Sequence, residues 1–273
     1  MASGFDLDAY LRRIGSPRPV GIDLATLRRL HRAHLQAIPF ENLDIQMGRP
    51  IRIDPASVTA DLVGRARGGY CFQQNALFRL ALTEIGFAPR ACEGRVRVEA
   101  SGVRPRTHMV LIVPLESGEW LVDVGFGATG IAEPLLIGGP PTEYDGAVYR
   151  TVPEGRLHVL QQARLETWDD LYAFSPEPVE DIDYEVGNWY TSTHPDSGFV
   201  RTLTAQRMIG RTRHILRNLT YSTGEAGQWT SRSISRSEVA TLLRETFGLD
   251  IPDSARFRAL DEATPPDRGN NQH

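Results

Sequence analysis

The chain contains no lysine, so all 30 of its basic residues are arginines. Contacts with an anionic ligand must therefore come from arginine, histidine or backbone N–H groups. The 34 acidic residues leave a net charge of −4, which provides no general attraction to nucleic acids or to anionic membranes. We therefore expect partners other than nucleic acid and membrane.

Cysteine is scarce as well. The 273 residues include two cysteines, Cys71 and Cys92, which are too few for a disulfide framework. Together with the seven histidines they show no metal-ligand spacing such as CxxC or HExxH, so no metal is expected. We interpret His31 and His34, on an expected helix, as exposed or packing residues, and Cys92 as structural.

Long apolar runs are also missing. No stretch approaches the roughly 20 residues of a membrane-spanning helix. The N-terminus lacks the charged-then-apolar pattern of a secretory leader. We therefore expect a soluble, cytoplasmic protein, long enough to form one large domain or two to three smaller subdomains.

The first third of the chain has a helical pattern. Asp23 is a suitable cap for an expected helix over 24–38, and a second helix is expected over 56–66 after an Asp-Pro cap. A third pattern runs over 71–85 and stops at Gly86.

From about Arg90 the pattern changes to the alternation of β-strands. Strands are expected over 94–100, 107–113, 120–126, 147–152, 157–162 and 168–174. Further on we expect a helix over 180–190, strands over 199–209, 211–217 and 228–234, and a last helix over 236–247. The tail after Arg258 is polar and is expected to be loose.

These patterns predict an α+β fold in three parts. An N-terminal helical bundle, residues 1–90, carries Cys71. A central β-barrel or sheet, residues 91–178, follows, and a C-terminal α/β lid with the loose tail covers 179–273. The cleft between the first two parts is then the expected place for an active site.

Cys71 follows a Gly-Gly pair and opens the helix over 71–85. Unpaired N–H groups and the positive end of the helix dipole favour a thiolate at such a position, and a thiolate is nucleophilic. A buried structural cysteine is the alternative interpretation.

His108 and Asp123 are single polar residues within two apolar strands. A buried carboxylate requires a partner, and an imidazole on the neighbouring strand can supply one. Asp123 would then orient His108, and His108 would take the proton of Cys71. A turn centred at 115–116 places His108 opposite Asp123, whereas a turn centred at 117–118 separates them, and a structural His–Asp pair remains the alternative.

Several segments together resemble the arylamine N-acetyltransferase family of bacterial type. In order they are Pro39-Phe40-Glu41-Asn42-Leu43, Arg67-Gly68-Gly69-Tyr70-Cys71, Thr107-His108-Met109, Val122-Asp123-Val124-Gly125-Phe126-Gly127, and Trp189-Tyr190-Thr191-Ser192-Thr193-His194-Pro195 with Phe199. The resemblance runs from about Phe5 to Phe247. It implies a cysteine-protease-like Cys-His-Asp site made of Cys71, His108 and Asp123.

The resemblance also implies an activity. Members move an acetyl group from acetyl-coenzyme A to an aromatic amine or hydrazine by a ping-pong mechanism through an acetyl-cysteine. This activity belongs to xenobiotic metabolism. Acetyl-coenzyme A is a co-substrate, no cofactor is bound permanently, and a homodimer is one expected assembly.

By the same resemblance, particular positions contact the substrates. Phe40, Val96, Phe126 and Phe199 would line the slot for the aromatic acceptor. Thr107, Gly127, His194 and Phe199 would contact coenzyme A. Core packing is the alternative for the apolar residues, although the glycines that flank Phe126 favour a close approach of ligand or backbone.

Two positions depart from the family pattern. Gln73 stands where many bacterial members carry glutamate, which removes a negative charge near the thiol without harming its activation. Ala128 stands where a further glycine is common and adds a methyl group close to the expected acyl donor.

Other functions remain open. An amide synthase of the same family would use the same triad with a carrier-bound polyketide acyl chain as donor. A cysteine hydrolase or transglutaminase-like enzyme can share the order Cys, His, Asp. A binding or redox-sensing protein with one reactive thiol is the alternative that is not an enzyme.

Overall fold

A computed structural model of the chain describes residues 5–19, 21–98, 100, 102–127, 129–225, 227–252 and 254–261. Ala128 and residues 262–273, which make up most of the expected loose tail, lie outside the described residues. Among the helices of these ranges, none combines the length and the apolar character needed to cross a bilayer.

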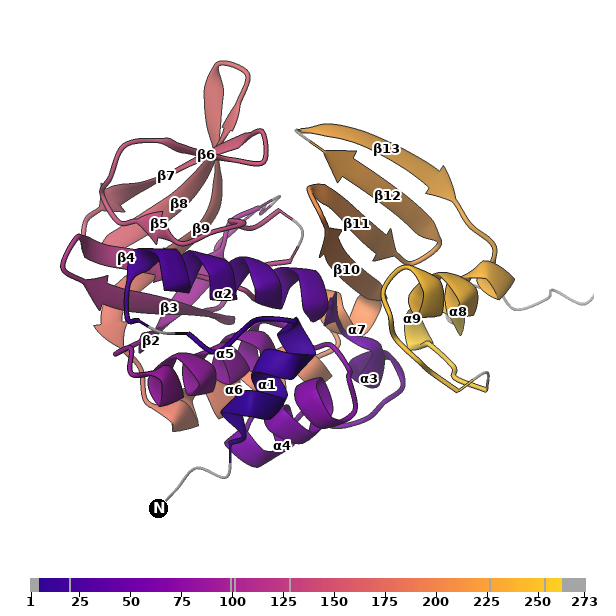
Figure 1. The fold of residues 1–273 in the computed structure, drawn as a ribbon. Helices are drawn as coiled ribbons and strands as arrows, with labels where there is room; N and C mark the ends of the chain where they lie inside the picture. Colours follow the sequence, from indigo (N-terminus) through magenta and orange to yellow (C-terminus); the bar gives the residue numbers. More distant parts are fainter. Residues whose placement is uncertain are drawn as a thin grey trace, which may run out of the picture.

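The N-terminal part is helical, as expected (Figure 1). Its helices are α1 (Leu7–Ile14), α2 (Leu24–Ala37), α3 (Leu43–Gln46), α4 (Pro55–Thr59), the π-helical turn η1 (Ala60–Gly64) and α5 (Cys71–Ile85). The predicted cap of α2 is present, since the Asp23 carboxylate accepts from the N–H of Thr26 at 2.7 Å. The expected helix over 56–66 is α4 continued by η1.

Helix α5 is the best predicted element. It begins at Cys71 and ends at Gly86, whose φ of 112° is the left-handed conformation that terminates helices. Its first turns are buried on all sides and pack against strand β3 (His108–Leu115). The nucleophile candidate therefore sits on the end of the helix that the core surrounds.

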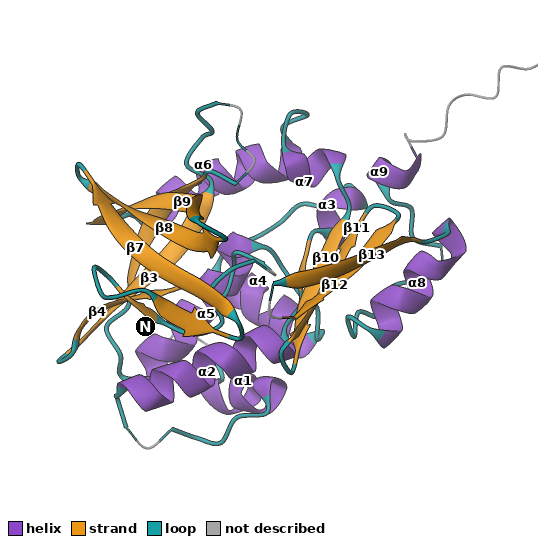
Figure 2. Cartoon of the chain, turned by 90° about the horizontal axis from the view of Figure 1, so that it is seen from above, coloured by secondary structure: helices purple, strands orange, loops and turns teal. Residues whose placement is uncertain are grey.

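The first sheet is antiparallel and has the strand order β5-β4-β3-β2-β9-β8-β7-β6. The remaining strands are β2 (Arg90–Val96), β4 (Gly118–Val122), β5 (Leu135–Leu136), β6 (Thr142–Tyr144), β7 (Ala147–Glu154), β8 (Leu157–Arg164) and β9 (Thr167–Pro178). It curls into a nearly closed, barrel-like form (Figure 2). Strand β5 at one edge accordingly packs against β7 near the other. The mixed helix and sheet class is thus confirmed, with a barrel-like sheet at its centre.

The second sheet has the order β1-β10-β11-β12-β13. Its strands are β1 (Phe40–Glu41), β10 (Thr204–Ile209), β11 (Thr212–Arg217), β12 (Thr220–Glu225) and β13 (Gln228–Ser233), and it packs with α8 (Arg236–Glu245) and α9 (Arg258–Asp261) (Figure 1). Phe40 pairs with Gln206 of β10 and bridges to Gly69. The C-terminal sheet is therefore attached to the loop that precedes Cys71.

Several predicted strands and one helix end have different bounds in the structure. The strand expected over 199–209 is wrong in its first half, because Gly198–Arg201 forms the short helix α7 that follows α6 (Asp181–Thr193). Strand β4 ends at Val122, so 123–126 form a loop, and β2 spans Arg90–Val96 where 94–100 was expected. Helix α8 ends at Glu245, not at 247, and strand β12 was not predicted.

Three clusters of buried apolar residues form the core. The first joins the helices to one face of the barrel-like sheet, the second fills the sheet's other side, and the third lies between the second sheet and α8. Met109 belongs to the helical cluster and Leu43 to the C-terminal one. Packing therefore crosses the expected divisions at 90 and 178, which stay a prediction.

Candidate active site

The Gly-Gly pair before Cys71 allows the chain to pack closely. A Cβ atom on Gly68 would lie 2.1 Å from the carbonyl oxygen of Pro39, and one on Gly69 would lie 2.8 Å from the Gln73 side chain. Larger residues would push this loop away from its neighbours. Cys71 is thereby held at the first position of α5, with 3% of its surface exposed.

A buried ion pair connects two of the motifs around this loop. The Nε and Nη2 atoms of Arg67 donate to the same oxygen of Glu41 at 3.1 and 2.8 Å, and Nη1 donates to Asp44 at 3.3 Å. Behind it, the amide of Gln74 donates to the carbonyl oxygens of Pro39 and Gly69 at 2.8 and 3.2 Å. These contacts fix the approach of the chain to the thiol.

His108 and Asp123 form a buried pair. The Nε2 atom of His108 lies 2.7 Å from Oδ2 of Asp123, and the two residues are 3% and 1% exposed. Leu115 pairs with Gly118, so the turn is centred between the two positions considered from the sequence. Asp123 consequently lies diagonally from His108 just beyond the end of β4, and the loop conformation closes the gap.

The Asp123 carboxylate is held by more than the imidazole. Its Oδ1 atom accepts from the side-chain amide of Asn75 and from the N–H of Gly125, both at 2.9 Å. Burial raises the pKa of Asp123, but His108, Asn75 and Gly125 outweigh it and lower the pKa below its ordinary value. The carboxylate is therefore ionised at neutral pH.

The Cys71 side chain is close enough to the imidazole of His108 to raise its pKa. Since Nε2 faces Asp123, the nitrogen available to the thiol is Nδ1. The Cys71 sulfur additionally contacts the carbonyl oxygen of Thr107 at 3.6 Å. Burial lowers the pKa of His108, but Asp123 and then Cys71 raise it to about 10. The imidazole is therefore protonated at neutral pH, beside the ionised carboxylate of Asp123.

Aromatic rings surround this pair. The ring centre of Phe126 lies 5.2 Å from that of His108, and Tyr172 lies 4.8 Å from His108 and 4.9 Å from Phe126. Val96 stands opposite Tyr172 on the adjacent strand and so shares its face of the sheet. Phe126 and Val96 are thereby on the side of the sheet that carries His108.

A second aromatic group lies beside the residue that precedes Cys71. Phe199 is 5.4 Å from Tyr70 and 5.9 Å from Phe40, measured between ring centres. Phe40 is buried whereas Phe199 is half-buried. Among the expected acceptor contacts, Phe199 is thus the more accessible of this group.

The expected coenzyme A contacts lie in different settings. Gly127 has a φ of +86°, and a Cβ atom there would lie 2.5 Å from the Gln206 side chain, so glycine is required. Thr107 presents its carbonyl to the thiol, as described above. His194 ends α6, stacks on Tyr190 at 4.6 Å and accepts from the N–H of Asp196 at 3.1 Å. Their roles toward coenzyme A remain predictions.

Some residues at the site were not predicted from the sequence. Asn75 follows Cys71 by one helical turn, so its place on the same face of α5 could have been inferred from helical spacing. Tyr172, by contrast, reaches His108 only through the pairing of β2 with β9. His31 and His34 are both fully buried, so they pack in the core rather than face solvent.

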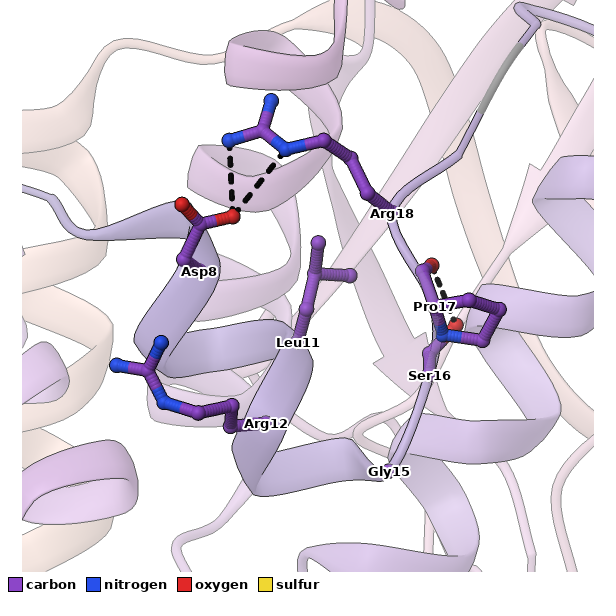
Figure 3. Close-up of a pocket in the computed structure, with 7 residues that line it drawn as sticks. All are labelled: Asp8, Leu11, Arg12, Gly15, Ser16, Pro17 and Arg18. Carbon is purple, nitrogen blue, oxygen red and sulfur yellow. Dashed lines mark hydrogen bonds and ion pairs between the residues drawn. The ribbon is translucent and has the colours of Figure 1, made fainter.

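Neither a metal site nor the open hollow of Figure 3 belongs to this arrangement. Within the described ranges, no group of three His, Cys, Asp or Glu side chains is placed to hold a metal ion. The hollow, of about 430 Å³, lies at the end of α1 beside the Asp8–Arg18 ion pair (Figure 3). Its lining includes none of the candidate site residues.

Comparisons with known proteins identify relatives of the whole chain. The family model described as N-acetyltransferase matches residues 23–256. An arylamine N-acetyltransferase of Mycolicibacterium smegmatis is 39% identical over 261 residues, which cover 92% of this chain and 94% of that protein. A more distant relative, proansamycin X synthase of Amycolatopsis mediterranei, is 31% identical and covers 85% of this chain and 92% of its own.

Solved structures of arylamine N-acetyltransferases have the same fold as this chain. The arylamine N-acetyltransferase of Salmonella typhimurium has a TM-score of 0.86 at 32% identity, covering 96% of this chain and 97% of that one. The Mycobacterium marinum arylamine N-acetyltransferase in complex with CoA has a TM-score of 0.84 at 34% identity, with 89% and 92% covered.

Proposed function

Because the chain belongs to the arylamine N-acetyltransferase family and is an acetyltransferase, we propose that it carries an acetyl group from acetyl-coenzyme A to an arylamine or arylhydrazine through an acetyl-Cys71 intermediate. The observation that supports this most is the contact chain from the Cys71 thiol through His108 to Asp123. Covalent acyl transfer uses an activated nucleophile, here a thiol, together with an oriented base.

In the first half-reaction, the Cys71 thiolate attacks the thioester carbonyl of acetyl-coenzyme A. A bond forms between the Cys71 sulfur and the acetyl carbon, and the bond from that carbon to the sulfur of coenzyme A breaks. The proton that left the thiol resides on Nδ1 of His108 and passes to the departing coenzyme A thiolate. One thioester replaces another, so this step is close to energetically neutral.

In the second half-reaction, the amine attacks the carbonyl carbon of acetyl-Cys71. His108 accepts the proton that the amine loses, the carbon–nitrogen bond forms, and the Cys71 thiolate leaves. Asp123 keeps Nε2 of His108 protonated throughout, so Nδ1 stays available as the base. The backbone N–H of Cys71, at the start of α5, is one donor for the oxyanion of both tetrahedral intermediates.

The substrate contacts are proposed on the same basis. Phe126, Val96 and Phe199 would hold the aromatic acceptor, with Phe40 supporting Phe199 from behind. Thr107, Gly127, His194 and Phe199 would contact coenzyme A, which is the ligand bound in the related Mycobacterium marinum structure. We also propose that the protein acts in the cytoplasm.

The family relationship supports a second candidate, an amide synthase that accepts a carrier-bound acyl chain, since proansamycin X synthase is among the relatives. The lower identity to that enzyme, compared with the arylamine N-acetyltransferase of Mycolicibacterium smegmatis, favours the acetyltransferase. A cysteine hydrolase would use the same triad but pass the acyl group to water.

The intermediate can be observed directly. With acetyl-coenzyme A and no amine, the intact mass should increase by one acetyl group, and the modified peptide should contain Cys71. An aromatic amine or hydrazine should remove the label and yield the acetylated product, whereas the Cys71→Ser variant should acquire no label. Steady-state lines at several amine concentrations should be parallel.

The alternatives give different results in the same experiment. Labelling only by a carrier-linked acyl chain would identify the amide synthase. Loss of the label to water at the same rate with and without amine would identify a hydrolase. Intersecting kinetic lines without an adduct would overturn the covalent mechanism.

A further inference from the structure

His31, on helix α2, connects two segments that the sequence places about a hundred residues away. Its Nδ1 atom lies 3.1 Å from the carbonyl oxygen of Ala132, and the backbone N–H of Asp123 donates to its Nε2 at 3.3 Å. Because a carbonyl oxygen only accepts and a backbone N–H only donates, Nδ1 must carry the ring hydrogen and Nε2 must hold the lone pair. The two contacts therefore define a single tautomer.

We propose that His31 is a positioning residue for the proposed triad, which holds the backbone of Asp123 so that its carboxylate meets His108. Strand β4 ends at Val122, one residue before Asp123. The N–H of Asp123 is thus beyond the regular strand pairing, in a buried site where an unpaired donor is unfavourable. His31 supplies the acceptor.

The neutral form of His31 is the form that the site stabilises. Burial lowers the pKa of His31 to about 4, against the opposing effects of the Ala132 carbonyl and the Asp123 carboxylate. Its ring also packs edge-on against Phe78 of α5 at 6.0 Å between ring centres. His31 thus touches α5, which carries Cys71, and the segment that carries Asp123.

A second contact also joins α2 to the segment that contains Ala132. Arg32, the next residue on α2, pairs with Glu133 at 3.0 Å and with Asp145 at 3.0 Å. Ala132 and Glu133 are therefore both attached to α2, one through His31 and the other through Arg32. This double attachment gives His31 a fixed position relative to Asp123.

His34 shows that burial on α2 is not sufficient for this role. It is equally buried, but its nitrogens contact the Tyr10 hydroxyl at 2.9 Å and the Gln74 amide oxygen at 2.7 Å. Neither partner belongs to the triad. The Tyr10→Phe variant therefore removes a buried hydrogen bond from the same helical layer without altering the contacts of Asp123.

Two amide substitutions separate the contacts of His31. Asparagine places its amide near the position of Nδ1, so His31→Asn can keep the donor to Ala132 but loses the acceptor for Asp123. Glutamine is longer, so His31→Gln can place an oxygen near the position of Nε2 and accept from Asp123 while losing the donor to Ala132. We expect kcat to fall about tenfold or more in His31→Asn, with KM little changed, and to be largely retained in His31→Gln.

A second readout requires neither substrate. The pH profile of Cys71 alkylation by iodoacetamide should shift to higher pH in His31→Asn, because a displaced carboxylate stabilises the imidazolium less. It should not shift in His31→Gln or in Tyr10→Phe. Equal kcat and equal alkylation profiles in wild type and His31→Asn would overturn the proposal, as would a loss of kcat in Tyr10→Phe as large as that in His31→Asn.

The tautomer can be tested in the unaltered enzyme if the variants fold poorly. In protein labelled with ¹⁵N-histidine, long-range ¹H–¹⁵N spectra at neutral pH should show His31 protonated at Nδ1 alone. A ring protonated at Nε2, or at both nitrogens, would overturn the proposal. The kinetic test rests on the proposed acetyl transfer, whereas the alkylation and tautomer tests do not, so failure of the activity and failure of this proposal are distinguishable.

Discussion

A buried hydrogen bond of 2.9 Å joins Asn75 to Asp123, and the two oxygens of the Asp123 carboxylate have different partners. Oδ1 accepts from Asn75 and from the N–H of Gly125, which leaves Oδ2 for His108. Asn75 also donates to the carbonyl oxygen of Met109 at 2.7 Å, next to His108. One side chain of α5 thus positions both partners of the thiol.

Asn75→Asp is expected to damage the site through charge. Two carboxylates would then face each other in a buried space, so one of them must take up a proton. The His108 imidazolium would lose stabilisation, and we expect kcat to fall at least about tenfold, with the acid limb of the pH–rate profile moved to higher pH. The measurement is kcat between about pH 5 and pH 9.

Gln73→Glu is the matched control for that variant. It also introduces a carboxylate into the first turns of α5, but Gln73 contacts the N–H of Tyr70 at 3.4 Å, which a carboxylate can accept equally well. We expect kcat within about threefold of wild type, below the ~1 kcal/mol effect of a lost hydrogen bond. Equal damage by both variants would show that charge near the thiol, and not contact with Asp123, is responsible.

Asp123→Asn tests the orientation of the imidazole. An amide at this position can donate to Nε2 of His108, which would leave the ring hydrogen on Nδ1 and deprive Cys71 of its base. Turnover should then fall by about four orders of magnitude, as for the corresponding change in serine-protease triads. Circular dichroism would check folding, and a folded variant with most of its activity would remove Asp123 from the proposed triad.

The helix that carries Cys71 was predictable because local signals agree there. A glycine pair precedes it, an apolar pattern follows, and Gly86 ends it in the left-handed conformation. The pairing of His108 with Asp123 was predictable in kind, since a carboxylate in an apolar strand requires a partner. Their register was not, because it depends on which residues of the segment after Pro114 form the turn.

Contacts between distant segments account for what the sequence did not reveal. The N–H of Asp123 reaches His31 over 92 positions of the chain, and no spacing rule connects them. The segment at Gly198–Arg201 reads as the start of a strand by composition, but Ser197 caps it as a short helix through the N–H of Phe199. Strand β13 was recognised whereas its partner β12, rich in Thr and Ser, was not.

The pH dependence of Cys71 alkylation should reveal the interaction of the thiol with the His108 imidazole. The raised pKa of His108 means that the imidazolium is available over a wide range of pH. We therefore expect iodoacetamide to modify Cys71 at pH values well below about 8.5, where an ordinary thiol has lost most of its thiolate. The rate would be followed by mass spectrometry of the two cysteine peptides.

Cys92 is the internal control for this measurement. It is fully buried, and burial raises its pKa to about 11, so it should remain unmodified throughout. A Cys71 profile that follows an ordinary thiol would contradict the ion pair. The His108→Gln variant should show that ordinary profile.

The two buried histidines of α2 predict a loss of stability in mild acid. Burial lowers the pKa of His31 to about 4 and that of His34 to about 3, whereas in the unfolded chain both take up a proton near 6.5. The unfolded state therefore binds more protons as the pH falls below 6.5. The free energy of unfolding should drop with a slope that approaches about 1.4 kcal/mol per pH unit for each histidine once the pH is well below 6.5.

His34→Gln tests this without altering the contacts of Asp123, and urea unfolding at about pH 7 and about pH 5 measures it. Removing one titrating group should reduce the loss of stability between the two pH values by about 1.9 kcal/mol, even if the variant is less stable than wild type at neutral pH. Leu30→Ala, at a buried neighbour on α2, should lower stability equally at both values. If His34→Gln and wild type lose the same free energy between the two pH values, His34 is not held neutral in the folded protein, and the acid sensitivity must come from other groups such as His31.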